Sequence, residues 1–305
     1  MRKTIAVLAL AGAVAVALTG CSVVGNDAPC PTPVPSGGAA AQVQVSGDFD
    51  KKPDVLVPTP LVAQSASRQV LITGDGPVAQ PGATVRVEAS IFDGSSGELL
   101  QQTNYADPAQ AAMVQLQPDA IIPAISDGLS CLPQGSRVVV AASGEETGQS
   151  SSLIYVLDLV QVFPSHATGF AMQLPEGFPA VVTNDTGRPG VVVPNIEPPA
   201  QERIANRING NGAVVQSGDT VLVQYTGVLW EGGKVFDSSW TKSTPATFTV
   251  PDQVVPGFAQ AVVGQKVGSQ VVAIVPPDQG YGDQGSGSVP AGATLVFVVD
   301  ILGIL

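Results

Sequence analysis

Gly218-Asp219-Thr220-Val221-Leu222-Val223 is a β-branched run that starts at a turn glycine, and such runs are typical of buried strands. A related run, Gly82-Ala83-Thr84-Val85-Arg86-Val87, lies 136 residues earlier. Two other pairs of segments share this offset: 53–58 with 189–194, and 74–78 with 210–214. Several matches at one separation indicate an internal repeat.

The repeat continues toward the C-terminus with small changes of offset. Residues 118–123 match 251–256 at an offset of 133, and residues 153–158 match 295–300 at 142. Collinear matches of this kind describe a duplicated domain with loop insertions. We therefore predict domains at residues 46–164 and 182–305, joined by a linker at residues 165–181.

The composition and the periodicity predict short strands and few helices. Glycine and proline contribute 34 and 26 of the 305 residues, which favours many turns. The best helix candidate in the second copy runs from Pro256 to Val263, because proline suits the first turn and Gly264 suits the stop. The expected fold class is α+β, with two tandem domains that each wrap an antiparallel sheet around a short helix.

Residues 1–20 predict an export signal. Arg2 and Lys3 precede fourteen residues of Ile, Ala, Val, Leu and Gly, a run too short to span a bilayer but typical of a signal peptide. It ends at Leu18-Thr19-Gly20-Cys21, which resembles a bacterial lipobox. An ordinary secretory signal with a chance cysteine is the alternative. The position of Cys21 favours lipidation, so we expect a cell-membrane protein, lipid-anchored on the extracytoplasmic face.

That interpretation also bears on the pairing of the two other cysteines. Residues 21–45 are rich in Pro, Gly and Ala and are expected to be an extended tether. In an oxidising compartment Cys30 and Cys131 could pair and attach this tether to the first domain. Two unpaired cysteines, with Cys131 buried, remain the alternative.

The charge balance excludes several classes of function. The net charge is −12, and an acidic chain lacks the clustered basic residues that nucleic-acid binding needs. His166 is the only histidine, so a metal site with several histidines is excluded. We expect no nucleic-acid partner.

Eight short motifs follow one another between residues 210 and 305. They are 223–227 (VQYTG), 233–239 (GKVFDSS), 254–258 (VVPGF), 264–268 (GQKVG), 275–277 (VPP), 280–282 (GYG), 289–290 (VP) and 293–297 (ATLVF). In this order and spacing they resemble the FKBP-type peptidyl-prolyl cis–trans isomerases.

The resemblance implies an apolar pocket that accelerates rotation of X–Pro bonds in client polypeptides. An unaided X–Pro bond isomerises in tens to hundreds of seconds, and a dry pocket favours its less dipolar twisted state. Such a pocket requires no nucleophile, and we expect no metal and no cofactor. The implied catalytic residues are Tyr225, Phe236, Asp237, Phe258 and Tyr281. The implied substrate-binding residues are Val254, Val255, Val289 and Phe297.

Within this resemblance Phe258 would be the pocket floor, Asp237 and Tyr281 would orient substrate carbonyls, and the backbone N–H of Val255 would hold the peptide. Phe248 is expected to be core. Phe258 stands where the family most often has tryptophan, and Ala246 where many members have an aromatic. These departures bear on catalytic efficiency, and only weak macrolide binding is expected.

The first copy lacks the pocket residues. The repeat aligns Ala89 with Tyr225, Leu100 with Phe236, Gln101 with Asp237, and Ile125 with Phe258. We interpret residues 46–164 as a degenerate, non-catalytic FKBP-like domain.

Three functions remain in competition. The leading one is a surface lipoprotein isomerase that helps exported proteins fold. A non-catalytic chaperone or client-binding lipoprotein would use the same cleft, although it would not need Asp237, Tyr225 and Tyr281. A solute-binding lipoprotein is disfavoured, because such proteins are usually α/β and helical periodicity is scarce here.

Overall fold

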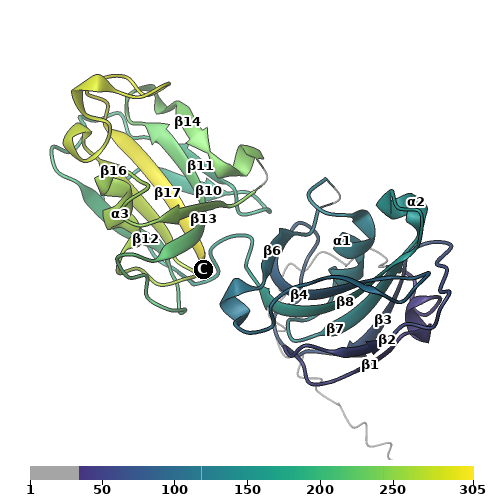
Figure 1. Cartoon of the computed structure of the whole chain (residues 1–305). Helices are drawn as coiled ribbons and strands as arrows, with labels where there is room; N and C mark the ends of the chain where they lie inside the picture. The colour runs from purple at the N-terminus through teal and green to yellow at the C-terminus, as the bar shows by residue number, and fades with distance from the viewer. Residues whose placement is uncertain (1–33, 118, 243) are drawn as a thin grey trace, which may run out of the picture.

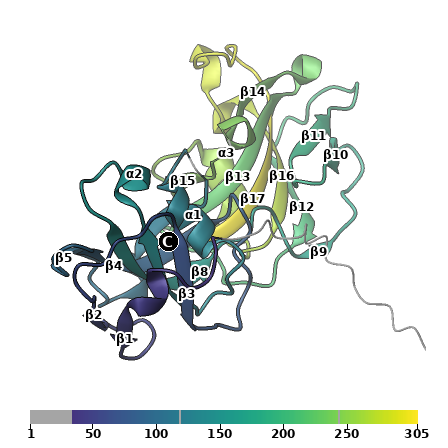
Figure 2. The ribbon, with the colours of Figure 1, turned by 90° about the vertical axis from the view of Figure 1, so that its right-hand side faces the viewer.

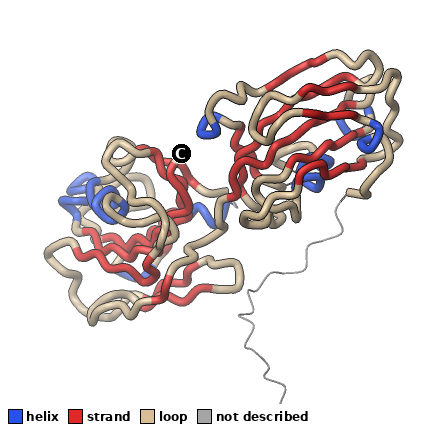
Figure 3. The backbone as a smooth tube through the Cα atoms, turned by 90° about the horizontal axis from the view of Figure 1, so that it is seen from below, coloured by secondary structure: helices blue, strands red, loops and turns tan. Residues whose placement is uncertain are grey.

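The computed structural model describes residues 34–117, 119–242 and 244–305, so the predicted signal peptide, Cys21 and Cys30 lie outside the described residues. Two antiparallel sheets form separate lobes, one in each half of the chain (Figure 1). We call residues 34–162 the N-terminal half and residues 163–305 the C-terminal half. The helices are few and short (Figure 3), as predicted.

The N-terminal half contains eight strands, two α-helices and two 3-10 helices among its described residues. The strands are β1 (Gln44–Ser46), β2 (Asp54–Leu56), β3 (Ser67–Ile72), β4 (Thr84–Asp93), β5 (Leu99–Gln102), β6 (Ala112–Gln115), β7 (Arg137–Ala142) and β8 (Leu153–Val162). The helices are η1 (Ala40–Gln42), η2 (Pro108–Gln110), α1 (Pro123–Leu129) and α2 (Gly144–Thr147).

The C-terminal half contains nine strands, one α-helix and four 3-10 helices among its described residues. The strands are β9 (Phe170–Ala171), β10 (Ala180–Thr183), β11 (Pro189–Val192), β12 (Arg203–Asn209), β13 (Thr220–Leu229), β14 (Val235–Ser238), β15 (Ala246–Thr249), β16 (Gln270–Val275) and β17 (Leu295–Ile304). The helices are η3 (Glu231–Gly233), η4 (Ser239–Lys242), α3 (Pro256–Val262), η5 (Pro277–Gln279) and η6 (Gly282–Gln284).

The two large sheets have the same strand order. The first runs β3-β7-β8-β4-β5 with β6 also on β4, and the second runs β9-β12-β16-β17-β13-β14 with β15 also on β13. The pairing registers agree with the sequence repeat: Ala89 pairs with Leu157 where Tyr225 pairs with Val299. The same offsets of 136 and 142 residues therefore relate the paired strands of one sheet to those of the other.

A short helix covers one face of each sheet. Phe258 and Val262 of α3 pack in a core with alternate residues of β13, β16 and β17, including Val223, Ala273 and Val299. In the N-terminal half α1 packs in the same way on β4, β7 and β8. This is the helix-and-sheet layer that the sequence predicts.

A small hairpin covers the opposite face of each sheet, and the sequence analysis missed this layer. Val181 and Val191 of the β10–β11 hairpin pack on the second set of alternate residues in β16 and β17, such as Ile274 and Val296. The β1–β2 hairpin does the same in the N-terminal half. Figure 2 shows β10 and β11 beside β12 and β16. Residues 165–181 also pack here, since β9 pairs with β12.

A buried polar pair lies at the equivalent position of each sheet, with different chemistry. In the N-terminal half Arg137 and Asp158 form a buried ion pair at 2.6 Å, and the guanidinium also donates to the carbonyls of Gly47, Asp48 and Lys51 in the hairpin turn. In the C-terminal half the equivalent residues are Gln270 and Asp300, joined by a 2.7 Å hydrogen bond. A cavity of about 220 Å³ lies beside them.

Phe163 connects the halves. Its backbone N–H donates to Thr84 of β4, whereas its ring packs on Leu222 and Leu302. The Arg86 guanidinium lies 5.6 Å from the ring centroid. Phe163 is 2% exposed, so its side chain is buried between Arg86 of the N-terminal half and Leu222 and Leu302 of the C-terminal half.

Two predictions concern the disulfide bond and the relation of the chain to a membrane. Cys131 is disulfide-bonded, while Cys21 and Cys30 lie outside the described residues, so the Cys30–Cys131 pairing stays a prediction. Within residues 34–117, 119–242 and 244–305 no helix has the length and apolar character needed to cross a membrane.

Asp300 makes stability depend on pH. Burial raises the pKa of its carboxyl to about 6, although hydrogen bonds from Ala167 and Gln270 and the charge of Arg207 oppose this. Between about pH 4 and pH 6 the unfolded chain has lost the Asp300 proton while the folded chain keeps it, so stability falls as pH rises. The pKa of Asp300 is about two units higher in the folded chain than in the unfolded chain. This difference corresponds to a loss of about 3 kcal/mol in the free energy of unfolding over that pH range.

Urea unfolding of the wild type and Asp300→Asn between pH 4.5 and 7.5 measures this contribution. The difference between their unfolding free energies should shift in favour of the variant as pH rises. His166, whose pKa burial lowers, is present in both proteins and cancels in the difference. Parallel stability curves would contradict the prediction.

Candidate functional site

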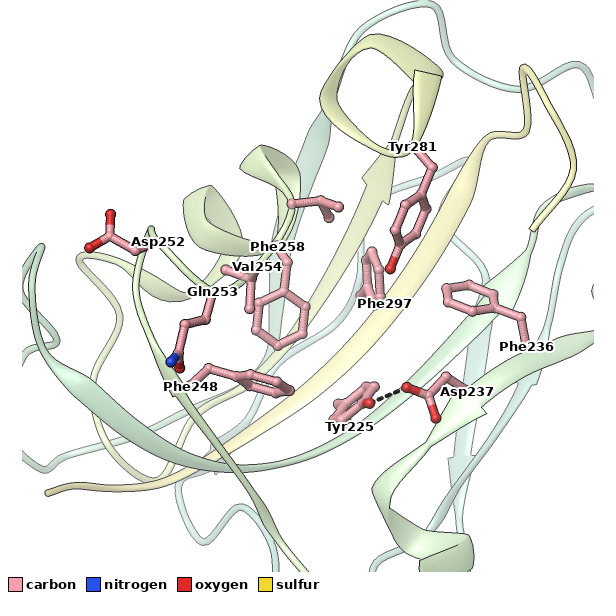
Figure 4. A pocket seen from close by; sticks show the side chains of 11 residues that line it. Tyr225, Phe236, Asp237, Phe248, Asp252, Gln253, Val254, Phe258, Tyr281 and Phe297 are labelled. Atoms are coloured by element: carbon pink, nitrogen blue, oxygen red, sulfur yellow. Dashed lines mark hydrogen bonds between the residues drawn. The ribbon is translucent and has the colours of Figure 1, made fainter. Parts of the chain in front are cut away.

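A pocket of about 440 Å³ opens on the face of the second sheet that α3 covers. It is built from β13, β14, β15, α3, β17, the loop before α3 and the loop after η5. The side chains converge on one hollow (Figure 4). Its lining comprises Tyr225, Phe236, Asp237, Phe248, Asp252, Gln253, Val254, Val255, Phe258, Tyr281 and Phe297.

The walls are aromatic rings that meet edge to face. Phe258 lies 5.3 Å from Phe297 and 5.9 Å from Tyr225, measured between ring centroids, with interplanar angles of 87° and 88°. Phe236 lies 5.7 Å from Phe297 and 6.5 Å from Tyr281. Such contacts stabilise a rigid apolar surface beyond the burial of area alone. The pocket can therefore hold its shape without a ligand.

Asp237 is the charged group on one wall. Its Oδ2 accepts a hydrogen bond from the Tyr225 hydroxyl, and its Oδ1 accepts one from the backbone N–H of Ser238 at 2.9 Å. The Lys242 Nζ approaches to 3.5 Å. Both partners of that ion pair are well exposed, so the pair contributes little to stability. The tyrosine bond is what orients the carboxylate.

The two tyrosine hydroxyls remain protonated over the physiological range. Burial is the main cause that raises the pKa of Tyr225, followed by its hydrogen bond to Asp237 and the charge of that carboxylate. Burial and Asp237 also raise the pKa of Tyr281. The pocket therefore offers two neutral hydroxyls at neutral pH, beside the side chain of Asp237.

Local sequence explains how the walls are placed. Pro256 stands in the first turn of α3, the helix ends at Val262, and Gly264 adopts φ +82° just beyond it. The predicted helix start at Pro256 is confirmed, and the predicted end at Val263 lies one residue beyond the observed end. Gly227 of β13 lies under the Phe236 ring, where a Cβ would stand 2.5 Å from a ring carbon. Any larger residue would displace that ring.

The structure brings together eight of the nine predicted pocket residues. Val289 is the exception: it is not among the residues that line the pocket, and it is buried in the core. Phe248, expected to be core, lines the pocket and meets the Phe258 ring at 5.6 Å. Asp252 and Gln253 were missed, since isolated polar residues before a helix carry no distinct signal. Alternation in β15, which places Ala246 and Phe248 on one face, could have identified the phenylalanine.

The N-terminal half has different groups at the equivalent positions. Gln101 pairs with Ile91 as Asp237 pairs with Gly227, so the alignment of Gln101 with Asp237 agrees with the register. Ile91 occupies the position at which glycine admits the Phe236 ring. Neither the acid nor the space for that ring is present in this half.

Within the described residues no cluster of His, Cys, Asp and Glu could hold a metal ion. The pocket also presents no cysteine, serine or histidine among its lining residues. Its chemistry is that of an apolar hollow with a few fixed polar groups.

The family model for "FKBP-type peptidyl-prolyl cis-trans isomerase" matches residues 212–302. The "FK506-binding protein" of Streptomyces anulatus is 41% identical over 120 residues, which cover 38% of this chain and 97% of that protein. The chain belongs to the FKBP-type peptidyl-prolyl cis–trans isomerases. All eight residues that line the pocket as predicted lie inside the matched range.

Two further proteins are similar to this isomerase. The "Probable FK506-binding protein" of Corynebacterium glutamicum is 35% identical over 115 residues, which cover 38% of this chain and 97% of that protein. The crystal structure of FkpA from Escherichia coli has a TM-score of 0.32 and 31% identity, covering 43% of this chain and 52% of that one.

The pocket suits the isomerase reaction because the barrier is electronic. Twisting a peptide bond removes amide resonance at a cost of about 18–20 kcal/mol, and the twisted bond is less dipolar than either planar form. An apolar wall that excludes water disfavours the planar forms relative to the twisted one. Rate acceleration requires no covalent intermediate.

Tyr225→Phe tests the carboxylate position. The variant keeps the ring contacts but removes the hydroxyl that donates to Asp237, and we expect kcat/KM for a proline tetrapeptide to fall about 3- to 10-fold. Tyr155→Phe in the N-terminal half is the matched control, because Tyr155 is equally buried and lies outside the pocket. Equal rates for Tyr225→Phe and the wild type would show that the hydrogen bond has no catalytic role.

Proposed function

We propose that this isomerase accelerates folding of exported or surface polypeptides from the extracytoplasmic face of a cell membrane. The observation that carries the proposal is the aromatic pocket around Tyr225, Asp237 and Phe258 in a chain whose first 21 residues read as a lipoprotein signal. Proline-containing segments of newly exported chains are its substrates.

Each pocket residue receives a role on this proposal. The proline ring rests on Phe258, which lies at the centre of the aromatic contacts with Tyr225, Phe248 and Phe297. The Asp237 carboxylate and the Tyr281 hydroxyl orient the substrate's carbonyl groups. The backbone N–H of Val255, whose side chain lines the pocket, holds the peptide.

The same pocket takes macrolides such as tacrolimus weakly. Phe258 offers less surface than the tryptophan expected at that position, and Ala246 leaves the neighbouring wall thin. The similar proteins from Streptomyces anulatus and Corynebacterium glutamicum are named as FK506-binding, which supports some affinity of this kind.

The chain contains two tandem FKBP-like domains, of which the first is degenerate and non-catalytic. The equal strand orders and the shared register support this assignment. Ala89, Leu100 and Gln101 replace the tyrosine, phenylalanine and aspartate of the second domain. A domain that has kept the strands of the fold and lost the pocket residues serves client binding or spacing from the membrane rather than catalysis.

Phe258→Ala and Ile125→Ala form a matched pair that locates the activity. Both truncate the buried residue at the same position of α3 or α1. Because Phe258 is the pocket floor, we expect its loss to lower kcat/KM by at least about tenfold, whereas Ile125→Ala leaves it unchanged per folded molecule.

The tetrapeptide assay also separates catalysis from simple client holding. A wild-type protein that binds unfolded chains but does not accelerate proline isomerisation would support the non-catalytic chaperone. A rate loss in Ile125→Ala equal to that in Phe258→Ala would contradict the degenerate assignment.

Cys21→Ser tests the anchor. The variant lacks the thiol that lipidation requires, so we expect metabolic labelling with a radioactive fatty acid to be lost, and the protein to be released or left unprocessed. Cys131→Ser is the control, because it removes a different cysteine and should keep the lipid label. Unchanged lipid incorporation in Cys21→Ser would contradict the lipobox assignment.

A further inference from the structure

A cleft of about 800 Å³ lies between the two halves. The loop from Pro77 to Thr84 and Gln115 line it from the N-terminal half, and Trp240 and Pro245 line it from the C-terminal half. Phe163 forms part of its lining where the halves meet. The cleft is larger than the isomerase pocket and separate from it.

One segment forms a wall of both hollows. Between β14 and β15 the chain presents Asp237 and Phe248 to the isomerase pocket, and Trp240 and Pro245 to the interdomain cleft. Along the chain Asp237 and Trp240 are three positions apart, and so are Pro245 and Phe248. A polypeptide leaving the isomerase pocket over this segment therefore reaches the cleft within a few residues, each of which spans up to about 3.3–3.6 Å.

The lining of the cleft favours binding of a peptide segment that has no charged side chains. Among the described residues that line it there is no Asp, Glu, Lys or Arg. Proline and aromatic surfaces stand beside the polar side chains of Gln224 and Gln115. A charged segment would lose its hydration here without gaining an opposite charge.

Trp240 adds a specific donor. Its Nε1 is buried and has no hydrogen-bond partner in the described part of the chain. Because an unsatisfied buried donor is costly, a turn of the indole that brings this N–H to a carbonyl of a bound peptide would be favoured. Aromatic grooves whose tryptophan and neighbouring polar groups meet peptide carbonyls are a recurrent means of binding extended, proline-containing chains.

The cleft is formed before a ligand arrives. Phe163 is fixed to β4 through its backbone and to Leu222 and Leu302 through its ring. The Thr244 hydroxyl donates to Gln115 Oε1 across the cleft at 3.0 Å. These contacts hold the two walls in a defined relation.

We propose that the cleft binds an extended, uncharged segment of the client polypeptide, adjacent to the proline held in the isomerase pocket. This inference rests on the proposed isomerase function and assigns a task to the N-terminal half. The half that lacks the isomerase pocket residues supplies one wall of a second binding site for the same client.

The test compares a proline tetrapeptide with the same tetrapeptide extended by ten uncharged Ala, Gln and Ser residues, on its amino side in one probe and on its carboxyl side in another. We expect one extension to raise kcat/KM about 5- to 10-fold, mainly through KM, since added contacts bind substrate and transition state alike. The ratio of extended to short substrate is measured within each protein variant, which separates cleft binding from basal activity.

Val78→Glu places a charge in the cleft at a residue that is 42% exposed, and Trp240→Phe removes the indole donor. Both should bring the ratio close to one. Val78→Gln is the matched control for shape and Leu71→Glu, 39% exposed and outside the cleft, is the control for charge; both should keep the wild-type ratio.

The outcomes distinguish the two proposals. A wild type that does not turn over the tetrapeptide contradicts the isomerase function itself. A wild type that turns over the tetrapeptide but gains nothing from either extension overturns the cleft proposal. A gain that persists in both Val78→Glu and Trp240→Phe also overturns it.

Discussion

The central strands β16 and β17 are largely apolar on both faces, and burial of both faces is the constraint on which the C-terminal half depends. One face is covered by α3, and the other by the β10–β11 hairpin. Val272, Ile274, Val296 and Val298 face the hairpin side and are fully buried. At about 1.5–3 kcal/mol for each such side chain, their burial is comparable with the whole stability of an ordinary domain. Residues 180–192 are therefore structural, although they precede the range that matches the family model.

Much of the fold and most of the site were predictable from the sequence, for identifiable reasons. The sequence offsets of the repeat agree with the pairing registers of the strands, because both depend on the same turn glycines and strand valines. Eight pocket residues were identified because their motifs combine an aromatic or acidic residue with a glycine or proline at fixed spacing. Val289 was misplaced because a valine in a motif can serve the core as well as the pocket.

The elements that could not be predicted depend on contacts distant in sequence. The hairpin strands have only three or four residues, and β11 begins with proline and glycine, so residues 165–181 and their surroundings resembled a linker. Phe163 lies at a predicted domain boundary, and nothing local indicates that its ring enters the other half. The Trp240 donor is conspicuous only because the three-dimensional structure buries it.

The position of β17 has a consequence for folding during synthesis. It is the last strand of its sheet in chain order but lies between β13 and β16, with which it shares most of the central pairing. Until residues 295–304 have been made, β13 and β16 lack their common neighbour and Phe163 lacks Leu302. The N-terminal half, whose own central strand β8 ends at Val162, can order first and wait with one exposed aromatic ring. A protein that assists the folding of other chains thus completes its own catalytic sheet only with its final strand.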